Sequence, residues 1–323
     1  MRAGFGNHPA PAEPKESHDD AADSRYAKRD QAEEAGVALG TCERIHHYQA
    51  DGPLGRWRVA SCLPATDLAD CVDTLWYGEG RVSYERDRIL PSGGSFLLIN
   101  LGPTQYLVDD QSAQRRRFED IWFSASRQTP IDTEAPHGQA LLGVAFRPHG
   151  AHPFFHLPAQ ETAEQVVPLA DLLGNEALAL RHRLLELSDD GERFDLVETW
   201  LRRRRRGSAP AALQHALRRI GETEGQIAID DLALELQLSR KTLARQFQLH
   251  VGLSAKTLAR LQRFQSALAW LSQCERVPWV ELAARCGYYD QSHLIRDFQA
   301  FSGYAPGEFV RLARPDASSV VVR

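Results

Sequence analysis

The sequence predicts an α+β protein with a β-rich N-terminal half and an all-helical C-terminal half. Three observations lead to this fold class. Short apolar runs broken by Gly, Pro and Asp fill residues 57–148, apolar residues recur at helical spacing from about residue 169, and one helical pattern near the C-terminus is repeated. A chain of 323 residues suffices for two domains, each with its own core.

The composition argues against several classes of protein. With 43% hydrophobic and 25% charged residues the chain resembles an ordinary globular protein. No apolar run approaches the roughly 18 residues that span a bilayer, and the N-terminus lacks the apolar core of a signal peptide. The five cysteines never have CxxC spacing, so neither a disulfide framework nor a thiolate zinc site is expected. We therefore expect a cytoplasmic protein with buried or free thiols.

The chain divides into five parts by pattern. Residues 1–42 contain almost no large apolar residues and are expected to be disordered. Residues 43–168 are predicted to form an antiparallel sandwich or barrel. Residues 169–209 are predicted as a helical connector that ends in five arginines, 202–206, which we interpret as a solvated helix end running into a linker. Residues 210–312 are predicted to be helical throughout, and residues 313–323 form a tail.

A repeat within residues 210–312 is the most informative feature. The segment SRKTLARQFQLHVGLSA, residues 239–255, aligns with DQSHLIRDFQAFSGYAP, residues 290–306, at an offset of 51 residues with five identities in seventeen. Two of these identities pair Leu243 with Leu294 and Arg245 with Arg296. On a helix the leucines share the buried face with a phenylalanine four residues later, whereas the arginines point away from it. Packing alone does not require an outward arginine in both copies.

Each copy has the pattern of two helices joined by a tight turn. Ser239 and Asp290 are expected N-caps of the second helix, and Gly287 suits the left-handed conformation of the turn. Upstream of each capped helix we expect a short helix with a buried apolar face, composed of Ile229, Leu232, Ala233 and Leu236 in the first copy and of Val280, Ala283 and Ala284 in the second. Two helices joined by a short turn, the second of them capped and outwardly polar, are typical of the helix-turn-helix motif, so each copy is predicted to be one such unit.

A long helix is predicted between the two units. Its apolar stripe contains Leu258, Leu261, Phe264, Leu268 and Leu271. A helix of about 20 residues is about 30 Å long, close to one turn of DNA, so both capped helices can face one side of a duplex. The charge of this region is slightly positive, with 12 Lys and Arg against 10 Asp and Glu in residues 207–312. The whole chain has a net charge of -5.

Residues 210–312 resemble the DNA-binding domain of the AraC/XylS family of transcription regulators. The block LAARCGYYDQSHLIRDFQAFSGYAPGEF follows the signature of the family's second helix-turn-helix unit almost throughout. Upstream, ILPSGGSFLLINLG and GVAFRPHGAHPFFHLPAQE resemble the sensor domain of one subgroup. This second resemblance implies a cupin-like β-barrel followed by helices, which senses an effector or forms dimers. Together they imply a regulator without enzymatic activity or cofactor, and promoter DNA and RNA polymerase as partners.

The resemblance also implies which residues contact DNA. In the first unit these are Arg240, Lys241, Ala244 and Arg245, and in the second Gln291, Ser292, Ile295 and Arg296. Arginine binds guanine or phosphate, glutamine pairs with adenine, and isoleucine packs on a thymine methyl. Phosphates are expected at the N-termini of the helices that follow each unit, near Ser254 with Lys256 and near Gly307. The competing interpretation of Arg296 is an ion pair with Asp297 or a contact with the long helix.

Two further functions remain open from the sequence. His149, His152 and His156 lie within eight residues, so a metal-dependent cupin-like enzyme fused to a DNA-binding module is the alternative, although the HxH-and-Glu pattern of metal cupins is missing. A module that acts mainly by protein contact is the third possibility. Trp57, Trp76, Trp122 and Phe146 are candidates for a ligand pocket but are more typical of a core.

Overall fold

The computed structural model describes residues 44–322, except residues 110, 111, 113, 272–276, 313, 316 and 317. The disorder expected for residues 1–42 lies outside this range. The strands are β1 Ile45–Gly52, β2 Gly55–Cys62, β3 Val72–Val82, β4 Arg86–Ile89, β5 Ser95–Asn100, β6 Gln105–Val108, β7 Arg115–Phe118, β8 Ile121–Ser124, β9 Ile131–Glu134, β10 Gln139–Phe146, β11 Val166–Pro168 and β12 Ser319–Val322. The helices are α1 His152–Phe155, α2 Ala159–Thr162, α3 Leu169–Leu173, α4 Asn175–Leu185, α5 Asp190–Arg204, α6 Ala211–Glu222, α7 Ile229–Glu235, α8 Arg240–His250, α9 Ala255–Leu271, α10 Trp279–Arg285, α11 Gln291–Ser302 and α12 Pro306–Phe309.

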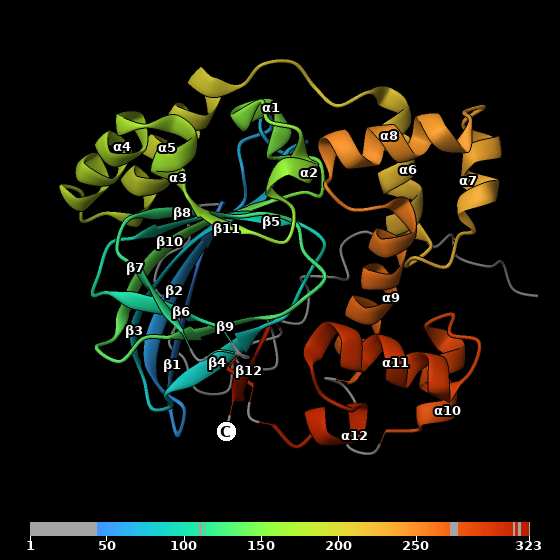
Figure 1. The fold of residues 1–323 in the computed structure, drawn as a ribbon. Helices are drawn as coiled ribbons and strands as arrows, with labels where there is room; N and C mark the ends of the chain where they lie inside the picture. The colour runs from blue at the N-terminus through green and yellow to red at the C-terminus, as the bar shows by residue number, and fades with distance from the viewer. Residues whose placement is uncertain are drawn as a thin grey trace, which may run out of the picture. The chain divides into compact units, whose positions relative to one another are not determined.

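Two antiparallel sheets make up the β-rich half, as the sequence predicts (Figure 1). The strand order is β1-β2-β3-β10-β5-β8-β11 in the larger sheet and β12-β4-β9-β6-β7 in the smaller. Successive side chains of β5 point to opposite faces of the larger sheet, and apolar residues pack on both faces. Leu97 and Ile99 join the core beneath α3, α4 and α5, whereas Leu98 joins Leu107 and Ile131 of the smaller sheet. The strands therefore enclose one core between the sheets and another beneath the helices.

Of the four aromatic residues that were candidates for a ligand pocket, two are buried and two are half-buried. Trp122 and Phe146 are buried, whereas Trp57 and Trp76 are half-buried. Trp76 lies across β10 at Gly143, where a Cβ would come within 2.2 Å of the indole ring. A glycine is therefore required at that point of the sheet because any side chain would displace Trp76.

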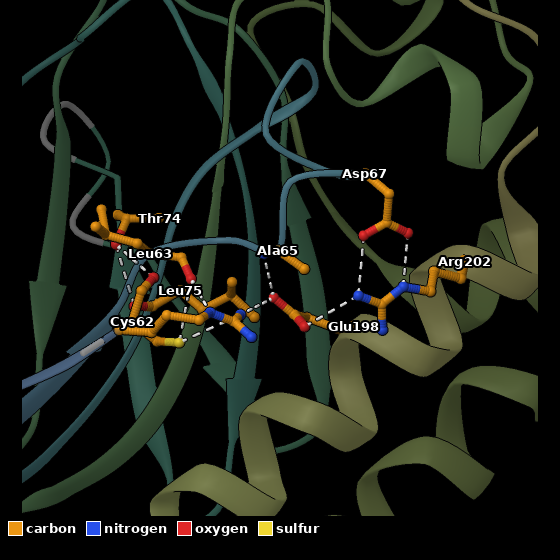
Figure 2. Close-up of polar contacts among 9 residues, drawn as sticks. Cys62, Leu63, Ala65, Asp67, Thr74, Leu75, Glu198 and Arg202 are labelled. Atoms are coloured by element: carbon orange, nitrogen blue, oxygen red, sulfur yellow. Dashed lines mark hydrogen bonds and ion pairs between the residues drawn. The ribbon is translucent and has the colours of Figure 1, made fainter. Parts of the chain in front are cut away.

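Helix α5 is joined to the β-rich half by a buried carboxylate. Glu198 accepts hydrogen bonds from the backbone N–H of Ala65 at 2.8 Å and from Arg202 at 3.3 Å, and it also pairs with Arg44 (Figure 2). Arg202 in turn binds both carboxylate oxygens of Asp67, at 2.7 and 3.0 Å. Because the side chain of Glu198 is only 2% exposed, these donors offset the cost of burying its charge.

Other arginines at the end of α5 also pair with carboxylates. Arg205 binds both carboxylate oxygens of Asp70, at 2.6 and 3.0 Å, and Arg204 pairs with Glu176 at 2.6 Å. Helix α5 ends at Arg204, as the sequence predicts, and the arginine run is exposed or half-buried. The pairing of Arg202, Arg204 and Arg205 with carboxylates was not predicted.

The helical half has a single core formed along α9. Its five predicted stripe residues are all buried, together with Leu213 of α6, Leu243 of α8 and Leu294 of α11. Within the described residues helix α9 has 17 residues, Ala255–Leu271, and is about 26 Å long. The predicted apolar face of α10 is partly wrong, because Val280 is 74% exposed and Ala284 is also exposed. Ala283 is buried as predicted, and Leu282 and Cys286 are buried with it.

The tail holds a strand that the sequence did not predict. After α12 the chain pairs residues 319–322 with β4 in antiparallel register, as the C-terminal strand beside β4 in Figure 1 shows. Val320 is fully buried and joins Leu90 in the hydrophobic core that includes the helices α6 to α11. Strand β12 is therefore an edge strand of the smaller sheet.

Three of the cysteines lie in the described part of the chain, and all three are buried thiols. Burial raises the pKa of Cys62 and of Cys286 to about 11 and that of Cys71 to about 12. These thiols are therefore protonated at neutral pH and have little nucleophilic character.

Candidate nucleic-acid interface

Helices α7 and α8 form the first two-helix unit. Leu232 and Ala233 of α7 pack against Leu243 and Phe247 of α8 in one core. The Ser239 hydroxyl accepts a hydrogen bond from the backbone N–H of Thr242 at 3.1 Å, which confirms the predicted N-cap. The turn between the helices places a non-glycine residue, Gln237, in the left-handed region with φ of 54°.

Helices α10 and α11 form the second unit with the same design. The Asp290 carboxylate accepts from the backbone N–H of His293 at 2.7 Å, and Gly287 has φ of 70°, so both predictions for this turn are confirmed. His293 faces the turn, where its ring meets Tyr288 edge-on at 5.2 Å. Gly303 ends α11 with φ of 80°.

The two repeated arginines lie at equivalent positions of α8 and α11, and both are exposed. Neither Arg245 nor Arg296 forms an ion pair with any residue within the described range. Arg296 makes only a long contact from Nε to the backbone oxygen of Ser292, at 3.4 Å. The first competing interpretation, an ion pair between Arg296 and Asp297, is contradicted, because the Asp297 carboxylate pairs with Arg260 of the long helix at 2.7 Å.

The other predicted base-contacting positions share the same outward faces. Lys241 and Ala244 are exposed on α8, and Gln291 and Ser292 are exposed in the first turn of α11. Ile295 is half-buried. Arg240 is exposed but pairs with Asp230 of α7 at 2.6 Å, so DNA would have to compete for its guanidinium group.

The two predicted phosphate positions differ in how well they would bind an anion. Ser254 caps α9 by accepting from the backbone N–H of Thr257 at 3.0 Å, and Lys256 is exposed beside it. Gly307 lies in α12, which has only four residues and carries exposed Glu308 in its first turn. The first position therefore combines a capped helix start with a cation, whereas the second has a neighbouring negative charge.

Contacts that the sequence did not predict hold the units to the long helix. Besides Asp297, Arg260 of α9 lies over the ring of Phe301, at 5.1 Å from its centroid. Arg263 donates to the backbone oxygen of Gly225 at 2.8 Å and lies over Tyr288. Two arginines of α9 therefore face the protein rather than a duplex, although the sequence offers no pattern that separates them from outward arginines.

The last turn of α8 contacts the β-rich half. The ring of His250 lies 4.3 Å from that of His152 in α1, measured between centroids. His250 is 9% exposed, and its Nδ1 has no hydrogen-bond partner within the described structure. Burial, together with neighbouring His152 and His149, lowers the pKa of His250 to about 4. The contact is therefore made by neutral imidazole rings.

The three histidines proposed as alternative metal ligands do not converge. His149 is buried, His152 faces His250, and Nε2 of exposed His156 lies 3.2 Å from the backbone oxygen of Arg204. Within the described residues, no group of three or more His, Cys, Asp or Glu side chains is arranged to hold a metal ion. The described structure therefore offers no support for the metal-cupin alternative.

Comparison with known proteins agrees with this geometry. Residues 232–312 match the model of a helix-turn-helix domain, a range that spans α8, α9, α10 and α11. These residues form a DNA-binding helix-turn-helix domain of the AraC type. Residues 60–168, in the β-rich half, match a domain of unknown function (DUF6597). No curated protein matches the chain. Among the described helices, none is long and apolar enough to cross a membrane.

Solved structures of AraC-type regulators are similar to the chain. ToxT from Vibrio cholerae with a bound unsaturated fatty acid is 10% identical, with a TM-score of 0.40 over 70% of this chain and 91% of that one. The C-terminal domain of AraT, a response regulator from Geobacillus stearothermophilus, is 23% identical, with a TM-score of 0.31 over 32% and 88%. The xylose-binding transcription activator xylR is 18% identical, with a TM-score of 0.29 over 46% and 40%. At these scores no functional conclusion follows from the alignments.

Proposed function

We propose that the chain is a sequence-specific transcription regulator that places α8 and α11 in the major groove of promoter DNA. The observation that carries the proposal is the repeated exposed arginine, Arg245 and Arg296, which lacks an ion-pair partner among the described residues in both copies. Each guanidinium group is free to donate two hydrogen bonds to a guanine, and one such contact discriminates between bases by about 1–3 kcal/mol.

The other predicted residues are proposed to contact bases or phosphates. Gln291 would pair with adenine and Ile295 would pack on a thymine methyl, with Ser292 beside them. In the first unit Arg240 and Lys241 lie one turn before Ala244, which is small enough for close approach to the bases. Ser254 with Lys256 would hold one phosphate and Gly307 another.

The N-terminal half is proposed to regulate this binding through a small-molecule effector or through dimerisation. A cavity of about 250 Å³ beside β7 and β8 is the candidate effector site. It is lined by the charged residues Arg116, Arg117, Glu119 and Asp120 and by apolar residues that include Ile121, Trp122 and Leu178. This volume lies just below the usual range of small-molecule sites, about 300–1,000 Å³. RNA polymerase and a second copy of the chain are the proposed protein partners.

In vitro selection tests the proposed function. The purified full-length chain would be incubated with a library of randomised duplexes, and bound DNA would be amplified over several rounds. We expect one enriched motif with two separated elements, bound more weakly as the salt concentration rises. An unenriched library would contradict the proposal, and weak binding that is insensitive to salt would favour a module that acts by protein contact.

A further inference from the structure

The second recognition helix contains a buried carboxylate directly beside its exposed arginine. Asp297 is 2% exposed, although its neighbour Arg296 is exposed. Its Oδ1 accepts hydrogen bonds from Arg260 of α9, from Nη2 at 2.7 Å and from Nε at 3.2 Å. His293, one turn earlier, places Nε2 3.9 Å from Oδ2. Burying a carboxylate costs free energy, and even a paired one often adds no stability over an apolar side chain of similar size. Stability alone therefore does not explain Asp297 at this position.

The contact with Arg260 restrains the rotation of α11. A planar guanidinium group that binds a carboxylate through two nitrogens fixes the orientation of both groups. The same guanidinium lies over Phe301, one turn beyond Asp297, so it holds α11 at two points along one face. Because consecutive helical residues are about 100° apart, this restraint also determines the direction in which Arg296 points.

The first unit lacks an equivalent contact. The residue that corresponds to Asp297 at the repeat offset of 51 is Gln246. Its Oε1 is buried and has no hydrogen-bond partner among the described residues. The ion pair to the long helix is therefore a feature of α11 and is not required by the helix-turn-helix fold itself.

We propose that Asp297 is a positioning residue that acts through Arg260 to set the rotation of α11 on α9, and with it the direction of Arg296 toward the bases. This inference rests on the proposed function, because it concerns how the second unit discriminates among DNA sequences. It assigns the base preference of that unit to a residue that does not touch DNA. A purely structural role predicts a loss of thermal stability without a change in base preference.

The probe for this inference is the duplex that the unaltered full-length protein enriches from a randomised library. Two derivatives of this duplex are made, one with base changes in the first element of the motif and one with base changes in the second. The specificity ratio of an element is the Kd for its derivative divided by the Kd for the parent duplex. The element assigned to the second unit is the one whose ratio falls in the Arg296→Ala variant. If the unaltered protein enriches no duplex, the proposed function fails and the inference falls with it before any variant is made.

The variants remove the ion pair from either side. We expect Asp297→Asn and Arg260→Gln each to lower the specificity ratio of the second element at least five-fold and to leave that of the first unchanged. The double variant should be no worse than either single variant, because both act through one contact. Asp231→Asn, which removes an exposed carboxylate from α7, is the matched control and should change neither ratio.

Three results would overturn the inference. These are a fall in melting temperature with both ratios unchanged, an equal fall of both ratios, and additive effects in the double variant. If a single variant does not fold, the double variant tests the same contact, because it leaves no unpaired charge in the core.

Discussion

At the scale of single residues, chemistry separates the arginines of the helical half into two groups. Arg260 and Arg263 are used within the domain, against a buried carboxylate and a backbone oxygen. Arg245 and Arg296 are exposed and have no ion-pair partner in the described part of the chain. The repeat in the sequence predicted the outward pair correctly. It could not identify the inward pair, because their partners lie about 40 residues away in the chain and meet them only in the folded structure.

A pH dependence is predicted from His250, whose imidazole is buried against His152. Its pKa is about 4 in the folded chain and near 6.5 when unfolded, so the unfolded state binds the proton more tightly. The stabilising effect of the neutral ring is therefore complete above about pH 6.5 and is lost as the pH falls toward 4. At pH 5 the loss amounts to about 2 kcal/mol.

Urea unfolding at pH 7 and pH 5 measures this effect. His250→Gln, which does not titrate, should lose about 2 kcal/mol less than the unaltered protein between the two pH values. His137→Gln, at an exposed position, should behave as the unaltered protein does. An equal loss in all three proteins would show that His250 does not titrate in this contact.

At the scale of secondary structure elements, the two units repeat each other in caps and faces but differ in their turns. The N-caps Ser239 and Asp290 and the left-handed Gly287 were predictable, because each depends on local backbone chemistry. Gln237 was not, because its left-handed conformation follows from the geometry of the turn rather than from its residue type. Val280 was also assigned wrongly, since periodicity over seven residues cannot distinguish neighbouring faces of so short a helix.

The left-handed conformation of Gln237 predicts that a glycine at this position changes the stability of the helical half. The left-handed conformation costs an ordinary residue about 1–2 kcal/mol, and glycine avoids that cost although its unfolded state is more flexible. Gln237→Gly should therefore stabilise the helical half by about 0.5–1 kcal/mol, measured by chemical denaturation. Gly287→Ala is the matched opposite change and should destabilise it. A destabilised Gln237→Gly protein would mean that the glutamine side chain makes a contribution that its exposed position does not suggest.

At the scale of the whole chain, the C-terminal residues belong to the sheet of the other half. Strand β12 follows the helix-turn-helix domain and pairs with β4, and Val320 is fully buried. The Arg88 guanidinium of β4, paired with Asp132 at 2.7 Å, also lies over the ring of Tyr304, just after α11. The sequence predicted both halves of the chain and their order. It did not predict these contacts, because four residues of strand in a tail carry no local signal of their partner.

Substitutions in β12 test whether this strand stabilises the fold. Val320→Asp would bury an unpaired carboxylate and should cost about 3 kcal/mol or more in free energy of unfolding. Val321→Asp, at the neighbouring half-buried position, should cost much less. Chemical denaturation of both variants gives the comparison, and equal costs would indicate that residues 319–322 do not pack as a strand in solution.

Helices α8 and α11 are each proposed to read one element of a two-part DNA site. Methylation interference tests this proposal most directly. Guanines of the selected duplex would be methylated at N7, in the major groove, and assayed with the unaltered protein and with Arg245→Ala and Arg296→Ala. We expect two blocks of interference about one helical turn, roughly 10 base pairs, apart, with each variant losing interference in a different block. A single block, or the loss of the same block in both variants, would contradict the account.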